Sequence, residues 1–206
     1  MESRFLLHNE AISGAGVTLL PSDKSHAAEL SVAAHDDTSF RYFSRGPTPF
    51  DEGGFESYIE SFSGDASVRM FTVRDDTSGS LIGMTSFLDI SPTQRSLEIG
   101  WTWYAPEWRS SYVNPGCKLA LLNLAFEGGL FDGLGAVRVQ LRTDELNARS
   151  RRAILKLGAQ FEGTLRNHVL TPNGELCARS IYSILPHEWE SVRHGLETRL
   201  KSIANA

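Results

Sequence analysis

A loop that leads onto a helix start is the stretch of this sequence best suited to bind a charged ligand. Residues 106–113 (PEWRSSYV) precede Asn114 and Pro115, which are typical of the N-cap and the first position of a helix. The first N–H groups of a helix have no partner within the helix and lie at the positive end of its dipole, so they favour phosphate. An ordinary strand-to-helix connection would give the same pattern.

A second feature is a basic segment in an otherwise acidic chain. Residues 134–170 carry seven arginines and lysines against three carboxylates, whereas the whole chain has a net charge of −5. Positive charge concentrated in this way suits a polyanionic ligand, and a solvated helix face rich in arginine is the alternative. We do not expect a nucleic-acid partner, because no basic stripe with interleaved aromatic residues accompanies the segment.

The strand and the helix on either side of the loop are visible as hydrophobic periodicity. Leu97, Ile99, Trp101 and Trp103 alternate with other residues, which predicts a β-strand with these four side chains on one face. Apolar residues at helical spacing then continue from the loop to Glu127. The loop is therefore expected between a strand and a helix.

The rest of the chain predicts a mixed α/β protein, in the order β-α-α-β-β-β-α-β-α-β-β-α. The strands between 68 and 104 are separated by short turns, which predicts an antiparallel meander, and Pro172-Asn173-Gly174 predicts a hairpin turn. Strands are expected at 17–20, 68–74, 81–90, 95–104, 137–142, 161–165 and 178–185, and helices at 25–34, 52–62, 115–127, 147–157 and 187–203.

Composition and cysteine usage favour a cytoplasmic protein without a metal site. Hydrophobic residues make up 41% and charged residues 22% of the 206 residues, so we expect one domain over 1–206, with 1–15 as a lead-in or an edge segment. No apolar run is long enough for a membrane span, and no signal peptide is recognisable. Cys117 and Cys177 are sixty positions apart, and the six histidines show no ligand spacing.

Three segments together resemble the GNAT N-acetyltransferase superfamily, and within it the branch that includes the ribosomal-protein N-terminal acetyltransferases. They are LEIGWTWY at 97–104, WRSSYVNPGCKLALL at 108–122 and NARSRRAILKLGAQFEGTLR at 147–166, supported by Leu81-Ile82-Gly83. The resemblance covers about residues 16–200. It implies a mostly antiparallel sheet with a parallel pair at the coenzyme site, acetyl-CoA as the acyl donor, a primary amine as the acceptor, and a homodimer as one assembly.

The loop departs from the pattern of this family. The family's pyrophosphate loop has the form Q/R-x-x-G-x-G/A, whereas here Arg109 is followed by Ser110, Ser111, Tyr112, Val113 and Asn114. Glycine in such a loop lets the backbone approach a phosphate closely. We expect the Ser110 and Ser111 hydroxyls and Arg109 to offset its absence, and a weakened coenzyme site is the competing outcome.

Glu98 is our first candidate for the general base, because an amine must lose a proton before it attacks a thioester. A solvent-facing or salt-bridged strand residue is the alternative for Glu98. The resemblance implies a local bulge in this strand, where backbone N–H groups near Trp101, Thr102 and Trp103 would bind the thioester oxygen. The two tryptophans can equally be core residues.

The resemblance also assigns roles in the segment that follows residue 146. Ser150 matches the family's proton donor for the departing thiolate, and a plain first-turn serine is its alternative. Asn147 matches a coenzyme-contacting residue and is equally an N-cap, while Arg149 and Arg152 would meet coenzyme phosphates. The predicted coenzyme site thus comprises Trp101, Thr102, Trp103, Arg109, Ser110, Ser111, Tyr112, Val113, Asn114, Asn147, Arg149 and Arg152.

Two functions follow from these patterns. The first is an enzyme that moves the acetyl group of acetyl-CoA to a primary amine by direct attack in a ternary complex. The second is a non-catalytic module that binds an acyl-CoA or a partner on the same fold, which the glycine-poor loop keeps open. The acceptor stays open among a peptide N-terminus, an amino acid, a polyamine and an antibiotic-like amine. No nucleotide-triphosphate loop or dinucleotide fingerprint is present.

Overall fold

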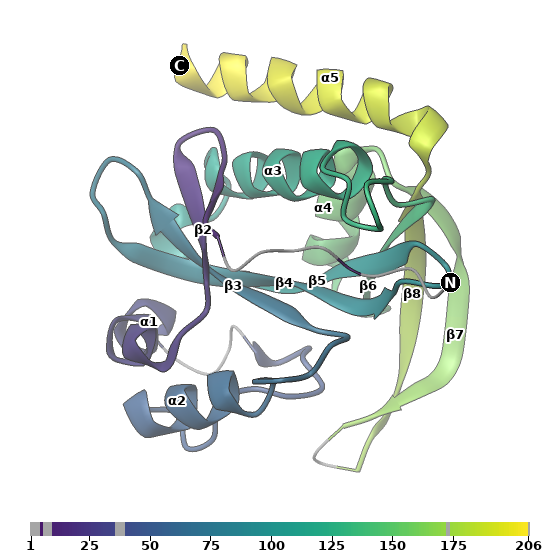
Figure 1. The fold of residues 1–206 in the computed structure, drawn as a ribbon. Helices are drawn as coiled ribbons and strands as arrows, with labels where there is room; N and C mark the ends of the chain where they lie inside the picture. The colour runs from purple at the N-terminus through teal and green to yellow at the C-terminus, as the bar shows by residue number, and fades with distance from the viewer. Residues whose placement is uncertain (1–4, 6–9, 36–39, 172–173, 206) are drawn as a thin grey trace.

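An eight-stranded sheet with helices on both faces forms the framework of the protein (Figure 1). The computed structural model describes residue 5 and residues 10–35, 40–171 and 174–205. Parts of two predicted segments lie outside the described residues. They are residues 1–4 and 6–9 of the segment 1–15, and Pro172 and Asn173 of the hairpin turn. The strand order is β1-β2-β3-β4-β5-β6-β8-β7.

The strands confirm the predicted mixed α/β class and the antiparallel meander of β3, β4 and β5. Every neighbouring pair is antiparallel except β5 and β6, which are parallel as the resemblance implied. β1 lies within residues 1–15, which the sequence left open as a lead-in or an edge segment, and it forms the edge of the sheet beside β2. The strands are β1 (Ile12–Ser13), β2 (Val17–Pro21), β3 (Arg69–Asp75), β4 (Leu81–Ser91), β5 (Ser96–Tyr104), β6 (Arg138–Asp144), β7 (Gln160–Leu170) and β8 (Leu176–Ile184).

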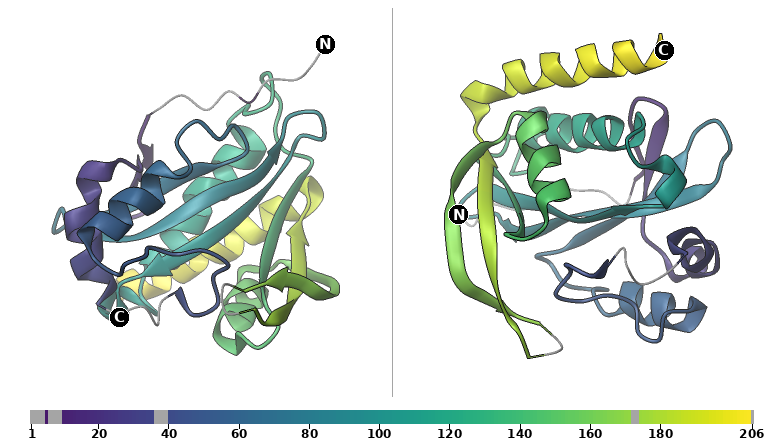
Figure 2. Two further views of the ribbon diagram at one scale, coloured as in Figure 1. Left: turned by 90° about the horizontal axis from the view of Figure 1, so that it is seen from below. Right: turned by 180° about the vertical axis from the view of Figure 1, so that it is seen from behind.

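The helices lie in two layers, with α3, α4 and α5 on one face of the sheet and α1 and α2 on the other (Figures 1 and 2). A short 3₁₀ turn precedes α1, and another precedes α3. The predicted helices at 25–34, 52–62 and 187–203 are all present with shifted ends. The helices are α1 (Ala27–Ala34), α2 (Glu52–Glu60), α3 (Val113–Glu127), α4 (Ala148–Leu157) and α5 (Pro186–Ala204).

The start of α3 differs from the prediction. The helix begins at Val113 with Tyr112 as its N-cap, so Asn114 is not the cap and Pro115 is the third helical residue. Proline is tolerated there, because the N–H groups of the first turn need no partner within the helix. At α4 the prediction was correct: Asn147 is the N-cap, and Gly158 ends the helix with a φ of 102°.

A bulge in β5 reverses the side-chain alternation of that strand. Met84 pairs with Trp103 and Ser86 with Gly100, so two residues of β5 stand opposite one residue of β4, and Trp101 has a φ of 45°. Leu97 and Ile99 therefore face α3, whereas Trp101 and Trp103 lie on the face covered by α2. The prediction that all four side chains share one face was wrong, because the alternating pattern in the sequence gives no sign of the extra residue that the bulge inserts into β5.

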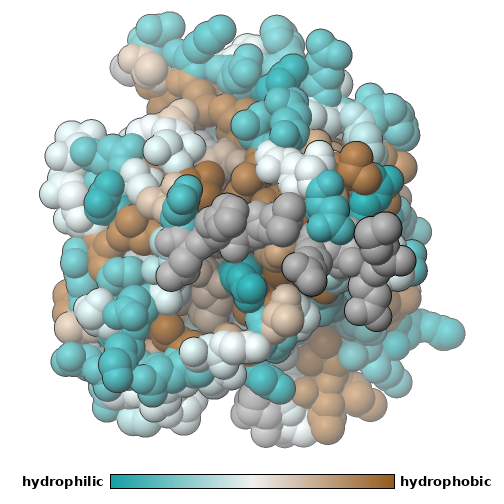
Figure 3. All heavy atoms as spheres, in the orientation of Figure 1, coloured by the Kyte–Doolittle hydropathy of each residue, from teal (hydrophilic) through white to brown (hydrophobic). Residues whose placement is uncertain are grey.

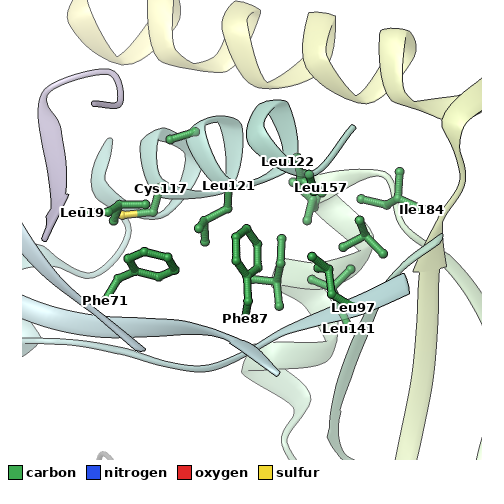
Figure 4. Close-up of a cluster of buried hydrophobic side chains, with 14 of the residues drawn as sticks. Leu19, Phe71, Phe87, Leu97, Cys117, Leu121, Leu122, Leu141, Leu157 and Ile184 are labelled. Carbon is green, nitrogen blue, oxygen red and sulfur yellow. The ribbon is translucent and has the colours of Figure 1, made fainter. Parts of the chain in front are cut away.

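The main core lies between the sheet and α3, where leucine and phenylalanine side chains meet (Figure 4). Phe71 and Phe87 point up from the strands, Leu121 points down from the helix, and Leu19 lies beside Cys117. α5 packs on the outer side of α3. A second cluster, which includes Phe40, Phe55 and Trp103, lies between the sheet and the helices α1 and α2.

The parallel strands β5 and β6 remain paired over only part of their length. Ser96, Leu97 and Glu98 pair with Arg138, Val139 and Gln140, and no pairing continues beyond these positions. From there β5 follows β4 as far as Tyr104, whereas β6 follows β8 as far as Asp144. The sheet therefore opens next to Glu98, between two strands that are both held firmly on their other sides.

The face shown in Figure 3 is mainly hydrophilic, with apolar atoms in small groups, one of them near the end of the β7–β8 hairpin. Leu170 and Leu176 are exposed at that end. Within the part of the chain that the structure describes, no helix has the length and apolar character needed to cross a membrane.

Candidate active site

A cavity of about 370 Å³ opens where β5 and β6 diverge. This volume lies in the range of small-molecule sites. Most of the residues that the sequence nominated contribute to its wall, whereas Tyr112, Val113 and Arg152 do not. The nominated residues that line it are Glu98, Trp101, Thr102, Trp103, Arg109, Ser110, Ser111, Asn114, Asn147, Arg149 and Ser150.

Glu98 lies at the apex of the divergence, with only 2% of its surface exposed. Its Oε2 is 3.0 Å from Nε of Arg142 and accepts a hydrogen bond of 3.0 Å from Gln140. Burial raises the pKa of Glu98 to about 7, against the lowering effect of Arg142 and Gln140. The ion pair anticipated as the alternative for Glu98 is present, but it lies in the cavity wall rather than in solvent.

Gly100 makes room for the Glu98 carboxylate. A Cβ at this position would lie 2.7 Å from Oε1 of Glu98, closer than real side chains approach. Both residues are on the α2 face of β5, ahead of the bulge. The lack of a side chain at Gly100 is therefore part of what allows Oε1 to reach the cavity while Arg142 and Gln140 hold Oε2.

Three ion pairs frame this end of the cavity. Arg142 bridges Glu98 and Asp89, with its Nη2 3.2 Å from Oδ2 of Asp89. Arg179 donates to Asp144 over 2.8 Å in a buried pair. Arg179 also donates to the backbone carbonyl of Tyr42, so it ties the loop after α1 to the sheet. Sequence reasoning missed this pair, because its residues come from β8 and β6 and meet only through sheet pairing.

The loop before α3 is shaped by its own hydrogen bonds. The Ser111 hydroxyl donates to the Trp108 carbonyl over 2.6 Å and accepts from the Val113 N–H. Ser110 has a φ of 64°, the left-handed conformation that glycine adopts most easily. Arg109 donates from Nε to the Tyr104 carbonyl. Ser110 thus holds a backbone conformation that glycine adopts most easily, while the Ser111 hydroxyl is used within the loop.

Tyr112 and Val113 point away from the cavity. The Tyr112 hydroxyl donates to buried Asp75 on β3, and its ring lies over Gly16, where an added Cβ would be 3.0 Å from a ring carbon. Val113 is fully buried in the core. These two side chains anchor the start of α3 to β2 and β3, so a tyrosine at a position where the family has glycine serves as a tether.

The start of α4 forms another part of the wall. Asn147 accepts a hydrogen bond of 3.0 Å from the Ser150 N–H, which is the N-cap role anticipated as its alternative. Ser150 and Arg149 line the cavity, whereas Arg152 is exposed on another side of α4. The basic segment therefore contributes only some of its cations to the site.

Lys118 is a cavity residue that sequence reasoning missed. Its side chain is 6% exposed and donates from Nζ to the Thr102 hydroxyl over 3.0 Å. Burial lowers the pKa of Lys118 to about 8. The available signal was spacing: Lys118 lies four residues after Asn114, so both occupy one face of α3.

Among the described residues, no group of three or more histidine, cysteine, aspartate or glutamate side chains is placed to hold a metal ion. The chemical groups that converge on the cavity are instead a buried carboxylate, a buried amine, arginines and the positive end of α3. A carboxylate with a pKa near 7 can exchange protons at neutral pH. The positive groups on the α3 side suit an anionic ligand.

A family model described as the acetyltransferase (GNAT) domain matches residues 17–160, so the chain belongs to the GNAT family. A search of curated protein sequences finds no significant match. Among solved structures, a protein from T. thermophilus described as an acetyltransferase is 30% identical, with a TM-score of 0.85 over 95% of this chain and 99% of the other.

A GCN5-related N-acetyltransferase from Brucella melitensis is 24% identical, with a TM-score of 0.85 over 97% of this chain and 89% of the other. Mycobacterium smegmatis RimJ, solved in complex with CoA-disulfide, is 19% identical, with a TM-score of 0.74 over 92% of this chain and 93% of the other. At these identities the likeness concerns the fold. The GNAT fold and membership of the family together support acetyl transfer as the general activity.

Proposed function

We propose that this protein is an N-acetyltransferase that transfers the acetyl group of acetyl-CoA directly to a primary amine in a ternary complex. The observation that carries the proposal is the position of Glu98. It is a buried carboxylate with a pKa of about 7, located where β5 and β6 separate and next to the β5 bulge. Such a group can take a proton from an ammonium acceptor near neutral pH.

Several features of the cavity fit the coenzyme. The start of α3 presents backbone N–H groups and a positive dipole end, and Arg109 and Arg149 both line the cavity. The left-handed backbone at Ser110 fits a phosphate-binding turn. Two structures with the same fold add support: M. smegmatis RimJ with CoA-disulfide, and spermidine N-acetyltransferase from Vibrio cholerae with CoA and spermine, which is 18% identical with a TM-score of 0.69.

Acetyl-CoA supplies the thioester when it is bound, and the residues of this chain then have separate tasks. Glu98 accepts the proton that the acceptor amine loses. Backbone N–H groups at the bulge near Trp101 and Thr102 stabilise negative charge on the thioester oxygen. The Ser150 hydroxyl lies in the cavity wall and donates a proton to the sulfur as the carbon–sulfur bond breaks.

The residues around Glu98 favour a cationic acceptor. Asp89 and Asp144 add carboxylates, and each is paired with an arginine that limits excess negative charge. A peptide N-terminus, an amino acid, a polyamine and an antibiotic-like amine all carry the required amine. We further propose a cytoplasmic location, which the two free cysteines support, and a homodimer stays a prediction.

The second candidate function is an acyl-CoA-binding module without turnover. It is favoured by the loop before α3, where a tyrosine is tethered to Asp75 and the Ser111 hydroxyl is used internally. A loop of this kind could hold a ligand firmly without presenting it for reaction. The buried carboxylate at Glu98 favours the enzyme, because a binding module has no need for a proton acceptor with a pKa near 7.

Two assays test the proposal in sequence. Thermal shift with acetyl-CoA, CoA and ATP is expected to show stabilisation by the first two and none by ATP. A thiol-release assay over peptides, amino acids, polyamines and aminoglycoside-like amines is then expected to show turnover with at least one acceptor. Binding of acetyl-CoA without thiol release from any amine would support the module, and the lack of any stabilisation by CoA would refute both functions.

A further inference from the structure

Lys118 is a buried cation of the cavity that lies on α3. It projects from the second turn of α3 toward the sheet and donates to Thr102, which lies at the β5 bulge. The Thr102 hydroxyl is in turn 2.8 Å from that of Thr85 on β4. Asn114, one turn earlier on the same face of α3, also lines the cavity. These residues form a polar path from the helix start to the bulge.

A buried ammonium group is expensive unless it is paired or fully hydrogen-bonded. Among the described residues, Lys118 forms no ion pair, and the Thr102 hydroxyl accepts only one of its three possible hydrogen bonds. The titratable group next to Lys118 is the buried thiol of Cys117, which in turn contacts the Tyr104 hydroxyl. Lys118 lines the cavity, so its remaining donors can serve a ligand there.

We propose that Lys118 binds a carbonyl oxygen in the pantetheine arm of coenzyme A. The inference rests on the proposed function and specifies which part of the donor this residue recognises. Phosphate is suited to the N–H groups at the start of α3, and Lys118 lies about 6 Å further along the helix axis than Asn114. This position is between the helix start and the bulge, where the arm connects the pyrophosphate to the thioester.

The alternative is a purely structural lysine that joins α3 to β5 through Thr102. The two roles differ in which ligands they affect. A residue that contacts the arm matters for coenzyme A and not for the nucleotide half alone. A residue that only positions α3 matters for both, because the helix start would move for every ligand that binds there.

The test is calorimetric titration of wild-type protein and of Lys118→Met with two probes, coenzyme A and 3′-phosphoadenosine 5′-diphosphate. Loss of a charge-assisted hydrogen bond is expected to weaken coenzyme A binding about tenfold to a hundredfold. Affinity for the nucleotide is expected to change by less than about twofold. Lys156→Met, an exposed residue on α4 that does not line the cavity, is the matched control and should leave both affinities unchanged.

The outcomes separate this inference from the proposed function. Failure of the wild-type protein to bind coenzyme A would refute the proposed function. Wild-type binding with equal affinity in Lys118→Met, or equal weakening for both probes, would overturn the role of Lys118 and leave the proposed function standing. Lys118→Gln keeps a neutral donor and should give an intermediate coenzyme A affinity, which provides the same comparison if the methionine variant does not fold.

Discussion

Replacing Glu98 by glutamine tests the central element of the mechanism, because it removes the proton acceptor and keeps the shape of the side chain. A positioned general base contributes about 10²- to 10⁴-fold to rate. We therefore expect kcat/KM to fall by that factor, which corresponds to about 3–5 kcal/mol of barrier. The wild-type rate should rise with pH to a plateau with an apparent pKa near 7, since burial raises the pKa of Glu98 to about 7.

The same substitution has a predicted effect on stability that does not depend on activity. The pKa of Glu98 is about 7 in the folded protein against an ordinary value of 4.5, so the folded state binds more protons between these pH values. Stability is therefore lost as pH rises from about 4.5 to 7, by about 3 kcal/mol in total, because the carboxyl ionises in the unfolded chain while it stays protonated in the folded protein. Glutamine does not ionise and avoids this cost.

Urea unfolding at pH 5 and pH 8 measures this effect directly. The free energy of unfolding of the glutamine variant, relative to wild type, should be about 2–3 kcal/mol higher at pH 8 than at pH 5. Any effect of the substitution that does not depend on pH cancels in this comparison. An unchanged difference between the two pH values would refute the raised pKa, and full kcat/KM in the variant would refute the base role of Glu98.

Three further substitutions test other parts of the site. Ser150→Ala should lower kcat and leave the affinity for coenzyme A nearly unchanged in titrations, and an unchanged kcat would remove Ser150 from the mechanism. Gly100→Ala should lower kcat/KM, because the added Cβ would lie 2.7 Å from Oε1 of Glu98. It should also lower the free energy of unfolding, measured in urea, by about 1–3 kcal/mol. Wild-type activity in this variant would show that the carboxylate can move freely. Tyr112→Phe should cost about 1–3 kcal/mol of unfolding free energy by leaving buried Asp75 short of a donor, and a melting temperature equal to that of wild type would contradict the tether.

The sequence was sufficient to predict features that depend only on residues close together in the chain. Asn147 and Gly158 delimit α4 as expected, because a cap and a left-handed terminus depend on neighbouring backbone. Periodicity located the strands and the helices to within a few residues, apart from β1 and from the end of β7, which runs to Leu170. The α3 start was displaced because Tyr112 is held by Asp75 from a distant strand, a contact that no local pattern records.

The sequence by itself determined the mixed α/β class and nominated Glu98 and the helix start as the chemical features. Only the tertiary structure decided how they work. The β5 bulge moved Trp101 and Trp103 to the opposite face of the sheet, and the separation of β5 from β6 created the cavity. Burial then set the pKa values of Glu98 and Lys118. The desolvation of a charged group depends on every element packed around it, so the shift of its pKa cannot be predicted from the neighbouring sequence alone.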